Sequence, residues 1–209
     1  MHKQSFLNFE ADKMFLRNKQ IWLNKNYEKD EIFLLLRNKI KKSDKLNILE
    51  VGCAAGYRLE FLKKKFPKCN FYGIDPSKIA LNSNNKKKIN LKLATADHLP
   101  FADKKFDIII YGFCLYLCDT VDLFKIASET YRTTKDKSLI IIADFIQDKV
   151  KYNKYKYVPG LFSRKMDYVN MFTWHPNINL INRKKKIEGT NKKFSKKNRE
   201  VSIVCLKKG

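Results

Sequence analysis

Residues 46–62 read Leu-Asn-Ile-Leu-Glu-Val-Gly-Cys-Ala-Ala-Gly-Tyr-Arg-Leu-Glu-Phe-Leu and predict a strand, a tight turn and a helix in succession. The apolar run 46–51 is short and suits a parallel strand that is covered on both faces. The small residues 52–56 let the backbone come close to a ligand, because little side chain blocks the approach. Leu59 and Leu62 recur at helical spacing, so we expect the helix to pack back on the sheet. A turn of this kind before a helix N-terminus forms a pocket of backbone N–H groups for a nucleotide-like ligand.

Two acidic residues follow at the ends of the next two predicted strands. The strand 70–75 ends in Asp75, about twenty residues after the turn, where a carboxylate can accept hydrogen bonds from both ribose hydroxyls. Asp97 directly follows a strand that is predicted over residues 91–96. The two glycines of the turn lie closer together than the first and third glycines of the dinucleotide-binding fingerprint. The spacing therefore disfavours a dehydrogenase.

This ordered set of strand ends resembles the class I S-adenosylmethionine-dependent methyltransferases, strongly over residues 46–145 and loosely elsewhere. Met-Asp-Tyr at 166–168 and Phe-Thr-Trp at 172–174 are similar to the type 11 group, in a subgroup often associated with bacterial surface-polysaccharide or modified-sugar pathways. The resemblance implies an α/β fold, a Rossmann-like, doubly wound, seven-stranded and mostly parallel sheet with an antiparallel C-terminal strand and helices on both faces. It also implies S-adenosyl-L-methionine as the cofactor. Ala54 departs from the family pattern, which usually has a glycine there, and a sheet that has lost its ligand is the alternative.

The resemblance also implies which residues contact the cofactor. Asp75 would bind the ribose and Asp97 the adenine amino group, with His98 covering the ring in preference to acting as a base. The complete implied set is Glu50, Gly52, Cys53, Gly56, Asp75, Pro76, Asp97, His98 and Phe113. No metal is expected.

The acceptor is expected beyond the fourth strand, predicted over residues 106–114, because open α/β sheets bind ligands at the carboxyl ends of their strands. This strand lacks the Asn or Asp, two prolines and aromatic residue typical of enzymes that methylate base amino groups, and the Pro-Cys pair of those that attack a pyrimidine carbon. Both absences disfavour nucleic acid as the acceptor. The predicted acceptor contacts are Phe15, Arg17, Asn18, Tyr116 and Trp174, and the candidates for a general base are Asp144, Tyr168 and His175. Ordinary packing is the alternative for Phe15, Arg17, Asn18 and Tyr116.

One domain is expected over residues 1–209, because this length and a hydrophobic fraction of 44% allow a single sizeable core. Its expected parts are a cap segment (1–27), a cofactor-binding core (28–145), an acceptor-recognition insert (146–177) and a closing β-hairpin (178–209). Helices are predicted over residues 28–42 and 121–133 by their apolar periodicity.

The chain carries a formal net charge of +23, which suits an anionic partner such as nucleic acid or a membrane surface. The excess is mostly lysine, and it is accompanied by abundant Asn and Ile, three residues that rise together in genomes rich in A and T. The lysines are also scattered, and the basic stretch near the C-terminus is interpreted as a solvated loop, with anion binding as the alternative. The scattered lysines include residues 63–65 and 86–88. The basic stretch near the C-terminus comprises residues 183–186, 192–193 and 196–197. We therefore interpret the charge as compositional drift and do not favour nucleic acid as a partner.

The five cysteines form no CxxC pair, and Cys114 and Cys118 have no histidine nearby in the sequence, so a zinc site is not predicted. Reduced thiols indicate an intracellular protein. The N-terminus lacks the apolar region of a signal peptide, and the apolar run 108–118 is too short to span a bilayer. A cytoplasmic protein without membrane contact is expected, and no oligomeric state follows from the sequence.

The sequence thus predicts an enzyme that moves a methyl group from S-adenosylmethionine to oxygen or nitrogen of a small molecule, such as a sugar or sugar nucleotide. Two alternatives stay open. One is an RNA-modifying methyltransferase that uses the basic surface, and the other is a non-catalytic module that binds the cofactor.

Overall fold

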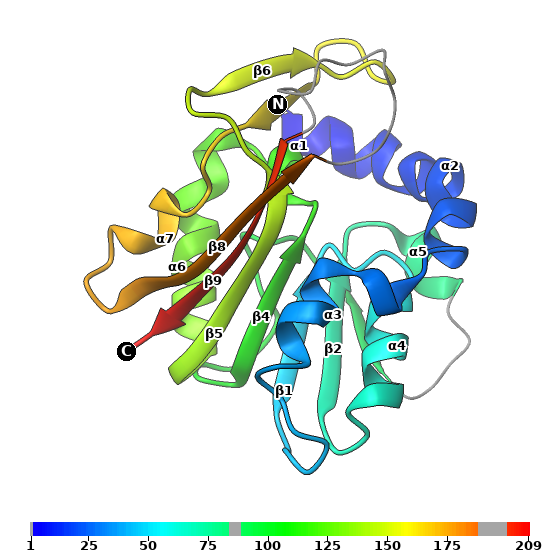
Figure 1. Cartoon of the computed structure of the whole chain (residues 1–209). Coiled ribbons are helices and arrows are strands. Elements are labelled where there is room, and N and C mark those ends of the chain that lie inside the picture. The colour runs from blue at the N-terminus through cyan, green and yellow to red at the C-terminus, as the bar shows by residue number, and fades with distance from the viewer. Residues whose placement is uncertain (1, 84–88, 188–199) are drawn as a thin grey trace.

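The computed structural model describes residues 2–83, 89–187 and 200–209, which form a seven-stranded sheet flanked by helices (Figure 1). The strands follow the order β3-β2-β1-β4-β5-β9-β8 across the sheet. Their bounds are β1 Asn47–Val51, β2 Asn70–Asp75, β3 Asn90–Leu93, β4 Phe106–Gly112, β5 Thr134–Phe145, β8 Ile178–Ile187 and β9 Glu200–Lys208.

β1 lies inside the sheet because it pairs in parallel with β2 on one side and with β4 on the other. β3 and β5 extend this parallel arrangement outward. β9 is antiparallel to both β5 and β8. The predicted Rossmann-like sheet with its antiparallel C-terminal strand is therefore confirmed. The five parallel strands all end at one edge of the sheet, so the turns that follow them meet there.

Helices lie on both faces of the sheet (Figure 1). Their bounds are α1 His2–Ser5, α2 Ala11–Leu23, α3 Glu31–Leu36, α4 Tyr57–Lys65, α5 Lys78–Asn82, α6 Leu123–Thr133 and α7 Asn170–Thr173, with a π-helix η1 Phe6–Glu10 and the 3-10 helices η2 Tyr27–Lys29, η3 Leu115–Leu117 and η4 Thr120–Asp122.

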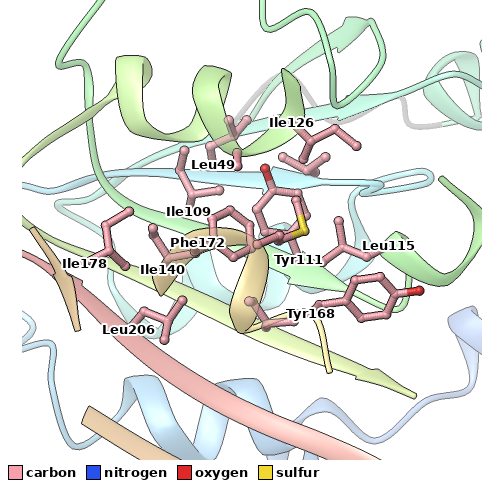
Figure 2. Close-up of a cluster of buried hydrophobic side chains, with 14 of the residues drawn as sticks. Leu49, Ile109, Tyr111, Leu115, Ile126, Ile140, Tyr168, Phe172, Ile178 and Leu206 are labelled. Atoms are coloured by element: carbon pink, nitrogen blue, oxygen red, sulfur yellow. The ribbon is translucent and has the colours of Figure 1, made fainter. Parts of the chain in front are cut away.

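Side chains of the strands alternate between two helical layers. Ile48 and Ile108 point to one face, where they belong to the same buried cluster as apolar residues of α3 and α4. Leu49 and Ile109 point to the other face, where α6 and α7 cover them, and Figure 2 shows part of that cluster. This period of two is what a strand with both faces buried requires.

Several predicted elements differ in length from the observed ones. The helix predicted over residues 28–42 is reduced to α3, because Asp30 caps its start by accepting a hydrogen bond from Ile32 N–H at 3.1 Å and the helix ends at Leu36. Ile40 lies beyond this end but stays buried in the core, which accounts for the longer apolar pattern. β5 begins four residues before the predicted Ser138.

The insert contains a second sheet that the sequence did not predict. Its strands are β6 Lys151–Lys154 and β7 Phe162–Lys165, which pair antiparallel. Figure 1 shows this hairpin beside α1, over the carboxyl ends of the parallel strands. The N-terminal helices and the insert therefore share one edge of the sheet.

α2 is fixed to α5 by a single carboxylate. Asp12 Oδ1 accepts hydrogen bonds from Ser77 Oγ–H at 2.6 Å and from Ile79 N–H at 3.0 Å. Phe15 of the same helix is buried in a small cluster with Ala55 and Ala80. These contacts hold α2 across the turn that follows β1.

Basic residues of β8 form ion pairs with other parts of the fold. Arg183 pairs with Asp167 at 2.7 Å, and Lys184 pairs with Glu31 at 3.0 Å. The lysines at 86–88, 192–193 and 196–197 lie outside the described residues, as does the connection between β8 and β9. No helix in the described ranges combines the length and the apolar character that a membrane crossing requires.

Candidate active site

A cavity of about 850 Å³ opens at the carboxyl ends of the parallel strands. Its wall comes from α1, α2, the turn after β1, the ends of β2 and β4, η3, residues 94–97, Tyr155 and Tyr157. The volume lies in the range of small-molecule sites, roughly 300–1,000 Å³.

The turn after β1 adopts the left-handed backbone conformation at Gly52 (φ +73°), Ala54 (φ +50°) and Gly56 (φ +74°). A Cβ atom at Gly52 would lie 2.6 Å from the Cβ atom of Cys114, so only glycine fits. The left-handed conformation of Ala54 costs roughly 1–2 kcal/mol, as it does for an L residue in general. The departure from the family pattern at this position therefore costs stability without changing the path of the turn.

Asp75 ends β2 with both carboxylate oxygens tied to the backbone. Oδ2 accepts a hydrogen bond from Ala54 N–H at 2.7 Å, and Oδ1 accepts one from Ser77 N–H at 2.8 Å. Burial raises the pKa of Asp75 to about 6, although these N–H groups favour the charged form. Each oxygen keeps further acceptor capacity, so the carboxylate can also bind a pair of ligand hydroxyls.

Asp97 follows β3 and carries an ion pair with the N-terminal helix. The Lys3 ammonium donates to Asp97 Oδ2, and the Lys3 backbone N–H donates to Asp119 Oδ2 at 3.1 Å. Burial acts to raise the pKa of Asp97, but hydrogen bonds from Lys3 and Thr95 outweigh it and lower that pKa. An N–H donor thus already occupies the carboxylate that the resemblance assigns to adenine.

A buried charge network lies beside the turn. Arg58 donates to Glu50 Oε1, and its Nε atom lies 3.3 Å from Asp30 Oδ1. Lys25 Nζ lies 2.5 Å from Asp30 Oδ2. Burial acts to raise the pKa of Asp30, but the charges of Arg58 and Lys25 lower it to about 2. Glu50 Oε2 is buried and has no hydrogen-bond donor among the described residues, which fits a cationic ligand group entering the cavity.

Aromatic side chains line the cavity beyond β4. Phe113, at φ +59°, meets Phe145 edge-on with ring centroids 5.5 Å apart, and Phe145 meets Tyr116 at 5.2 Å. Tyr155 and Tyr157 of the insert reach the same cavity. We call these five residues the acceptor end, and the part formed by the turn, Asp75 and Asp97 the cofactor end. Aromatic rings of this kind hold flat or cationic groups.

Glu10, the last residue of η1, joins the N-terminal helices to the acceptor end. Its side chain is 1% exposed, and its Oε1 atom accepts hydrogen bonds from Arg17 and from Tyr155 Oη–H, the latter at 2.7 Å. The Arg17 guanidinium also lies 3.7 Å from the ring centroid of Tyr157. Residues far apart in the chain are thereby brought together.

Most of the predicted site residues line the cavity. From the cofactor set they are Glu50, Gly52, Cys53, Asp75, Pro76, Asp97 and Phe113, and from the acceptor set Phe15, Arg17, Asn18 and Tyr116. Gly56, His98 and Trp174 are not part of the wall. Gly56 begins α4, His98 is exposed after β3, and Trp174 is 64% exposed beside α7.

Asp144, a candidate base, lies behind the cavity wall at the end of β5. Its Oδ2 atom accepts hydrogen bonds from the N–H groups of Leu115 at 2.9 Å and Tyr116 at 3.3 Å. Burial raises the pKa of Asp144 to about 7. The carboxylate thus holds η3 in place, which does not favour the predicted catalytic role.

The other two candidate bases also lie outside the wall. Tyr168 is part of the core cluster in Figure 2, and its hydroxyl donates to the Arg164 carbonyl at 2.7 Å. His175 packs against Tyr131 with ring centroids 4.1 Å apart. Both contacts are structural, so the geometry does not favour either residue as a base.

Four site residues were missed at the level of sequence: Lys3, Glu10, Arg58 and Tyr155. Arg58 sits in the quoted turn–helix segment, and its charge opposite that of Glu50 was a usable signal. Glu10 and Arg17 are seven residues apart, which exceeds the spacing of three or four residues that favours an ion pair along a helix, so the sequence carries no signal for their contact. Lys3 and Tyr155 have no such signal in a chain that contains so many lysines and tyrosines.

Residues 48–137 match the family model described as a methyltransferase domain. This segment contains the turn after β1, Asp75, Asp97 and β4, which are the elements that carry the cofactor end.

Two curated proteins match parts of the chain. A tRNA U34 carboxymethyltransferase from Nautilia profundicola is 39% identical over 75 residues, which cover 33% of this chain and 24% of that protein. A malonyl-[acyl-carrier protein] O-methyltransferase from Hamiltonella defensa is 29% identical over 120 residues, which cover 56% of this chain and 44% of that protein. The chain therefore spans less than half the length of these relatives.

Among solved structures, a 1,6-didemethyltoxoflavin-N1-methyltransferase from Burkholderia thailandensis, with 1,6-didemethyltoxoflavin and S-adenosylhomocysteine bound, has a TM-score of 0.70. It is 9% identical, and the likeness covers 99% of this chain and 89% of that one. At this identity the comparison shows the fold, which is that of S-adenosylmethionine-dependent methyltransferases. Together with the family match, it supports S-adenosylmethionine as the cofactor.

Proposed function

We propose that this protein is an enzyme that transfers a methyl group from S-adenosylmethionine to oxygen or nitrogen of a small molecule. The observation that carries the proposal is the single cavity wall that gathers Glu50, Asp75 and Asp97 from three successive strand ends. Carboxylates at these positions suit the ammonium, ribose hydroxyls and adenine amino group of one ligand.

The residues present fit this cofactor. The buried Glu50 Oε2 atom lacks a donor among the described residues, and a methionyl ammonium group would supply one. Asp75 would bind the ribose and Asp97 the adenine, in exchange for Lys3. When bound, the cofactor supplies an electrophilic methyl group on a sulfonium sulfur.

Positioning is the main contribution expected from the protein. Holding donor and nucleophile in line can lower the barrier by about 7–11 kcal/mol. The segments that would do this are the cap helices and the insert at residues 146–177, which we propose to be the acceptor-recognition part of a single domain. Phe15, Asn18 and Tyr116 are the predicted acceptor contacts that remain in the wall with Arg17.

The charge of the cavity wall supports a small acceptor without negative charge. The wall has carboxylates at Glu50, Asp75, Asp97, Asp119 and Asp122, against cations at Lys3, Arg17, Lys25 and Arg58. This is a slight negative excess in a chain whose net charge is +23. The positive charge that would attract a polyanion therefore lies outside the cavity and not in its wall. An uncharged sugar fits this wall better than a sugar nucleotide.

An RNA-modifying methyltransferase is the second candidate. The net charge of +23 and the segment similar to a tRNA U34 carboxymethyltransferase favour it. It predicts RNA binding that weakens steeply with salt, which an electrophoretic shift assay at two salt concentrations measures. Salt-independent or absent RNA binding would leave the small-molecule proposal.

Calorimetric titration with S-adenosylhomocysteine tests the proposed cofactor. Micromolar binding is the expected result, and no binding would support a fold that has lost its ligand. Binding without methylation of any acceptor would support the non-catalytic module. The proposed location is the cytoplasm, and the five free cysteines fit a reducing compartment.

A further inference from the structure

An acceptor hydroxyl or amino group loses a proton when it gains a methyl group, and a side chain that takes this proton would speed the transfer. Asp144, Tyr168 and His175 lie outside the cavity wall. Asp75 and Asp97 belong to the cofactor end. A further proton acceptor is therefore expected at the acceptor end.

Tyr155 has the required partner. Its hydroxyl donates to Glu10 Oε1 at 2.7 Å, and the side chain of Glu10 is 1% exposed. Glu10 Oε2 is also buried and has no hydrogen-bond donor among the described residues, so this carboxylate retains unused acceptor capacity. Tyr155 lines the cavity and Glu10 lies directly behind it.

Arg17 holds this pair in place. Its guanidinium donates to Glu10 Oε1, and its Nη2 atom lies 3.3 Å from Tyr155 Oη. A positive charge at this position compensates for burial of the carboxylate. Burial raises the pKa of Tyr155, and the hydrogen bond to Glu10 adds to the effect, so the phenol keeps its proton at neutral pH.

Tyr155 also lies on the side of the cavity where the acceptor is expected. Tyr116 and Tyr155 line the same cavity. Tyr116 meets the Phe145 ring, and Phe145 meets Phe113, the first residue after β4. Tyr155 thus shares its cavity with the aromatic side chains at the carboxyl end of β4.

We propose that Tyr155 is a catalytic residue that takes the acceptor's proton while it passes its own phenolic proton to Glu10. The acceptor oxygen or nitrogen forms its bond to the methyl carbon as the carbon–sulfur bond breaks, and the electron pair of that bond stays on sulfur. The acceptor proton moves to Tyr155 Oη, and the Tyr155 proton moves to Glu10 Oε1. Arg17 and Glu10 act as positioning residues, and Glu10 later returns its proton to solvent.

This step also balances charge. The positive charge of the sulfonium and the negative charge of Glu10 disappear together, so no net charge is created in a partly dry cavity. The inference rests on the proposed function and defines its acceptor as a small, uncharged or cationic ring compound with an O–H or N–H group. Rings suit the five aromatic side chains of the acceptor end.

Cofactor binding is the first test, because it needs no acceptor. S-adenosylhomocysteine is titrated into the wild type and into the Tyr155→Phe and Glu10→Gln variants. Affinities within about threefold of each other are expected, since the relay lies away from the cofactor end. A loss greater than tenfold in either variant would assign the pair to cofactor binding and overturn the proposal. Absence of binding by the wild type would instead refute the proposed function.

Methyl transfer is the second test. Labelled S-adenosylmethionine is supplied with phenol, catechol, tyramine, glucosamine and UDP-glucose as probe acceptors. We expect transfer to a ring alcohol or amine, with kcat lower by about 10²–10⁴-fold in Tyr155→Phe and KM nearly unchanged. Glu10→Gln should show a similar loss, and Glu10→Asp should restore part of the rate.

Two matched variants control for general damage. Tyr152→Phe changes a tyrosine of the same hairpin that is 56% exposed, and Glu28→Gln changes a surface glutamate paired with Lys65. Both should keep the wild-type rate. Transfer to none of the probes, transfer to UDP-glucose alone, or a wild-type rate in Tyr155→Phe would each overturn the proposal.

Discussion

The two ends of the cavity are built from very different stretches of chain. The cofactor end uses consecutive strand–turn units between β1 and Asp97. The acceptor end depends on a contact between Glu10 and Tyr155, which are 145 residues apart in the sequence. The first is therefore a local product of the sheet, whereas the second forms only when the N-terminal helices and the insert meet.

This difference separates what the fold requires from what the chain adds to it. Turns at the carboxyl ends of parallel strands must converge, so their carboxylates reach one ligand. The cap and the insert have no such constraint, and substitutions there can change the acceptor while the sheet stays intact. Variants at the two ends should accordingly fail in different ways.

The largest effect is expected at the charge network of the cofactor end. Arg58→Met should lower the free energy of unfolding by about 3–5 kcal/mol, because Glu50 and Asp30 lose a buried partner. Urea unfolding measures this loss. Lys65→Met on the same helix changes a half-exposed lysine and should cost less than about 1 kcal/mol. Equal losses for the two variants would mean that the network does not stabilise this end.

Asp75→Ala tests whether the cofactor end alone holds the cofactor. The affinity for S-adenosylhomocysteine should fall at least about 100-fold, or about 2.7 kcal/mol, because the ribose hydroxyls lose their acceptor. Calorimetry measures the affinity, and far-UV circular dichroism checks that the fold is kept. Asp136→Ala, an exposed acid far from the cavity wall, is the control. Unchanged affinity in Asp75→Ala would remove the ribose assignment.

Asp144→Asn distinguishes a structural carboxylate from a catalytic one behind the acceptor end. Burial raises the pKa of Asp144 to about 7, so the folded protein binds this proton more tightly than the unfolded chain does. The resulting stability is present below about pH 4 and is lost as the pH rises toward 7.

The wild type should therefore lose stability relative to Asp144→Asn between about pH 4 and 7, by about 3 kcal/mol. Urea unfolding at several pH values measures the difference. Asp148→Asn changes an exposed aspartate and is the control, whose difference in stability from the wild type should stay nearly constant over this pH range. A pH-independent difference, together with a rate of methyl transfer about 100-fold lower, would restore Asp144 as a candidate base.

Ala54→Gly should have the smallest effect. Relief of the left-handed strain stabilises the fold by roughly 1–2 kcal/mol, and the added freedom of the unfolded chain offsets about 0.4–1 kcal/mol of it. Thermal unfolding measures the net gain, and Ala80→Gly within helix α5 should instead lose about 2 kcal/mol, because it lowers helix propensity and removes a buried methyl group. An affinity for S-adenosylhomocysteine more than tenfold higher in Ala54→Gly would show that the methyl group obstructs the cofactor.

The same contrast explains what could be predicted from the sequence. Buried strands and small-residue turns leave short-range patterns, so β1, the following turn and Asp75 were placed correctly along the chain. The helix expected over residues 28–42 was too long because apolar periodicity marks burial and does not mark a helix end; Ile40 is buried outside any helix.

Contacts between segments far apart in the chain leave no short-range pattern in the sequence, so they could not be predicted. The ion pair between Lys3 and Asp97 and the hydrogen bond between Tyr155 and Glu10 join segments that the sequence does not relate. The β6–β7 hairpin was missed because a short, polar pair of strands has no apolar alternation. Asp144 was predicted as a base because it ends a strand, and only the structure reveals that its Oδ2 atom accepts hydrogen bonds from η3 and its Oδ1 atom one from Phe145 N–H.

The position of β9 has a consequence for the newly made chain. This strand comes after all the others in the sequence, yet it lies between β5 and β8. During synthesis, β5 has no neighbour on that side until residues 200–208 have left the ribosome, and β8 has no place to pair. A chain that stops early would therefore display the apolar edge formed by Ile140, Ile141 and Ile142, which invites aggregation and proteolysis.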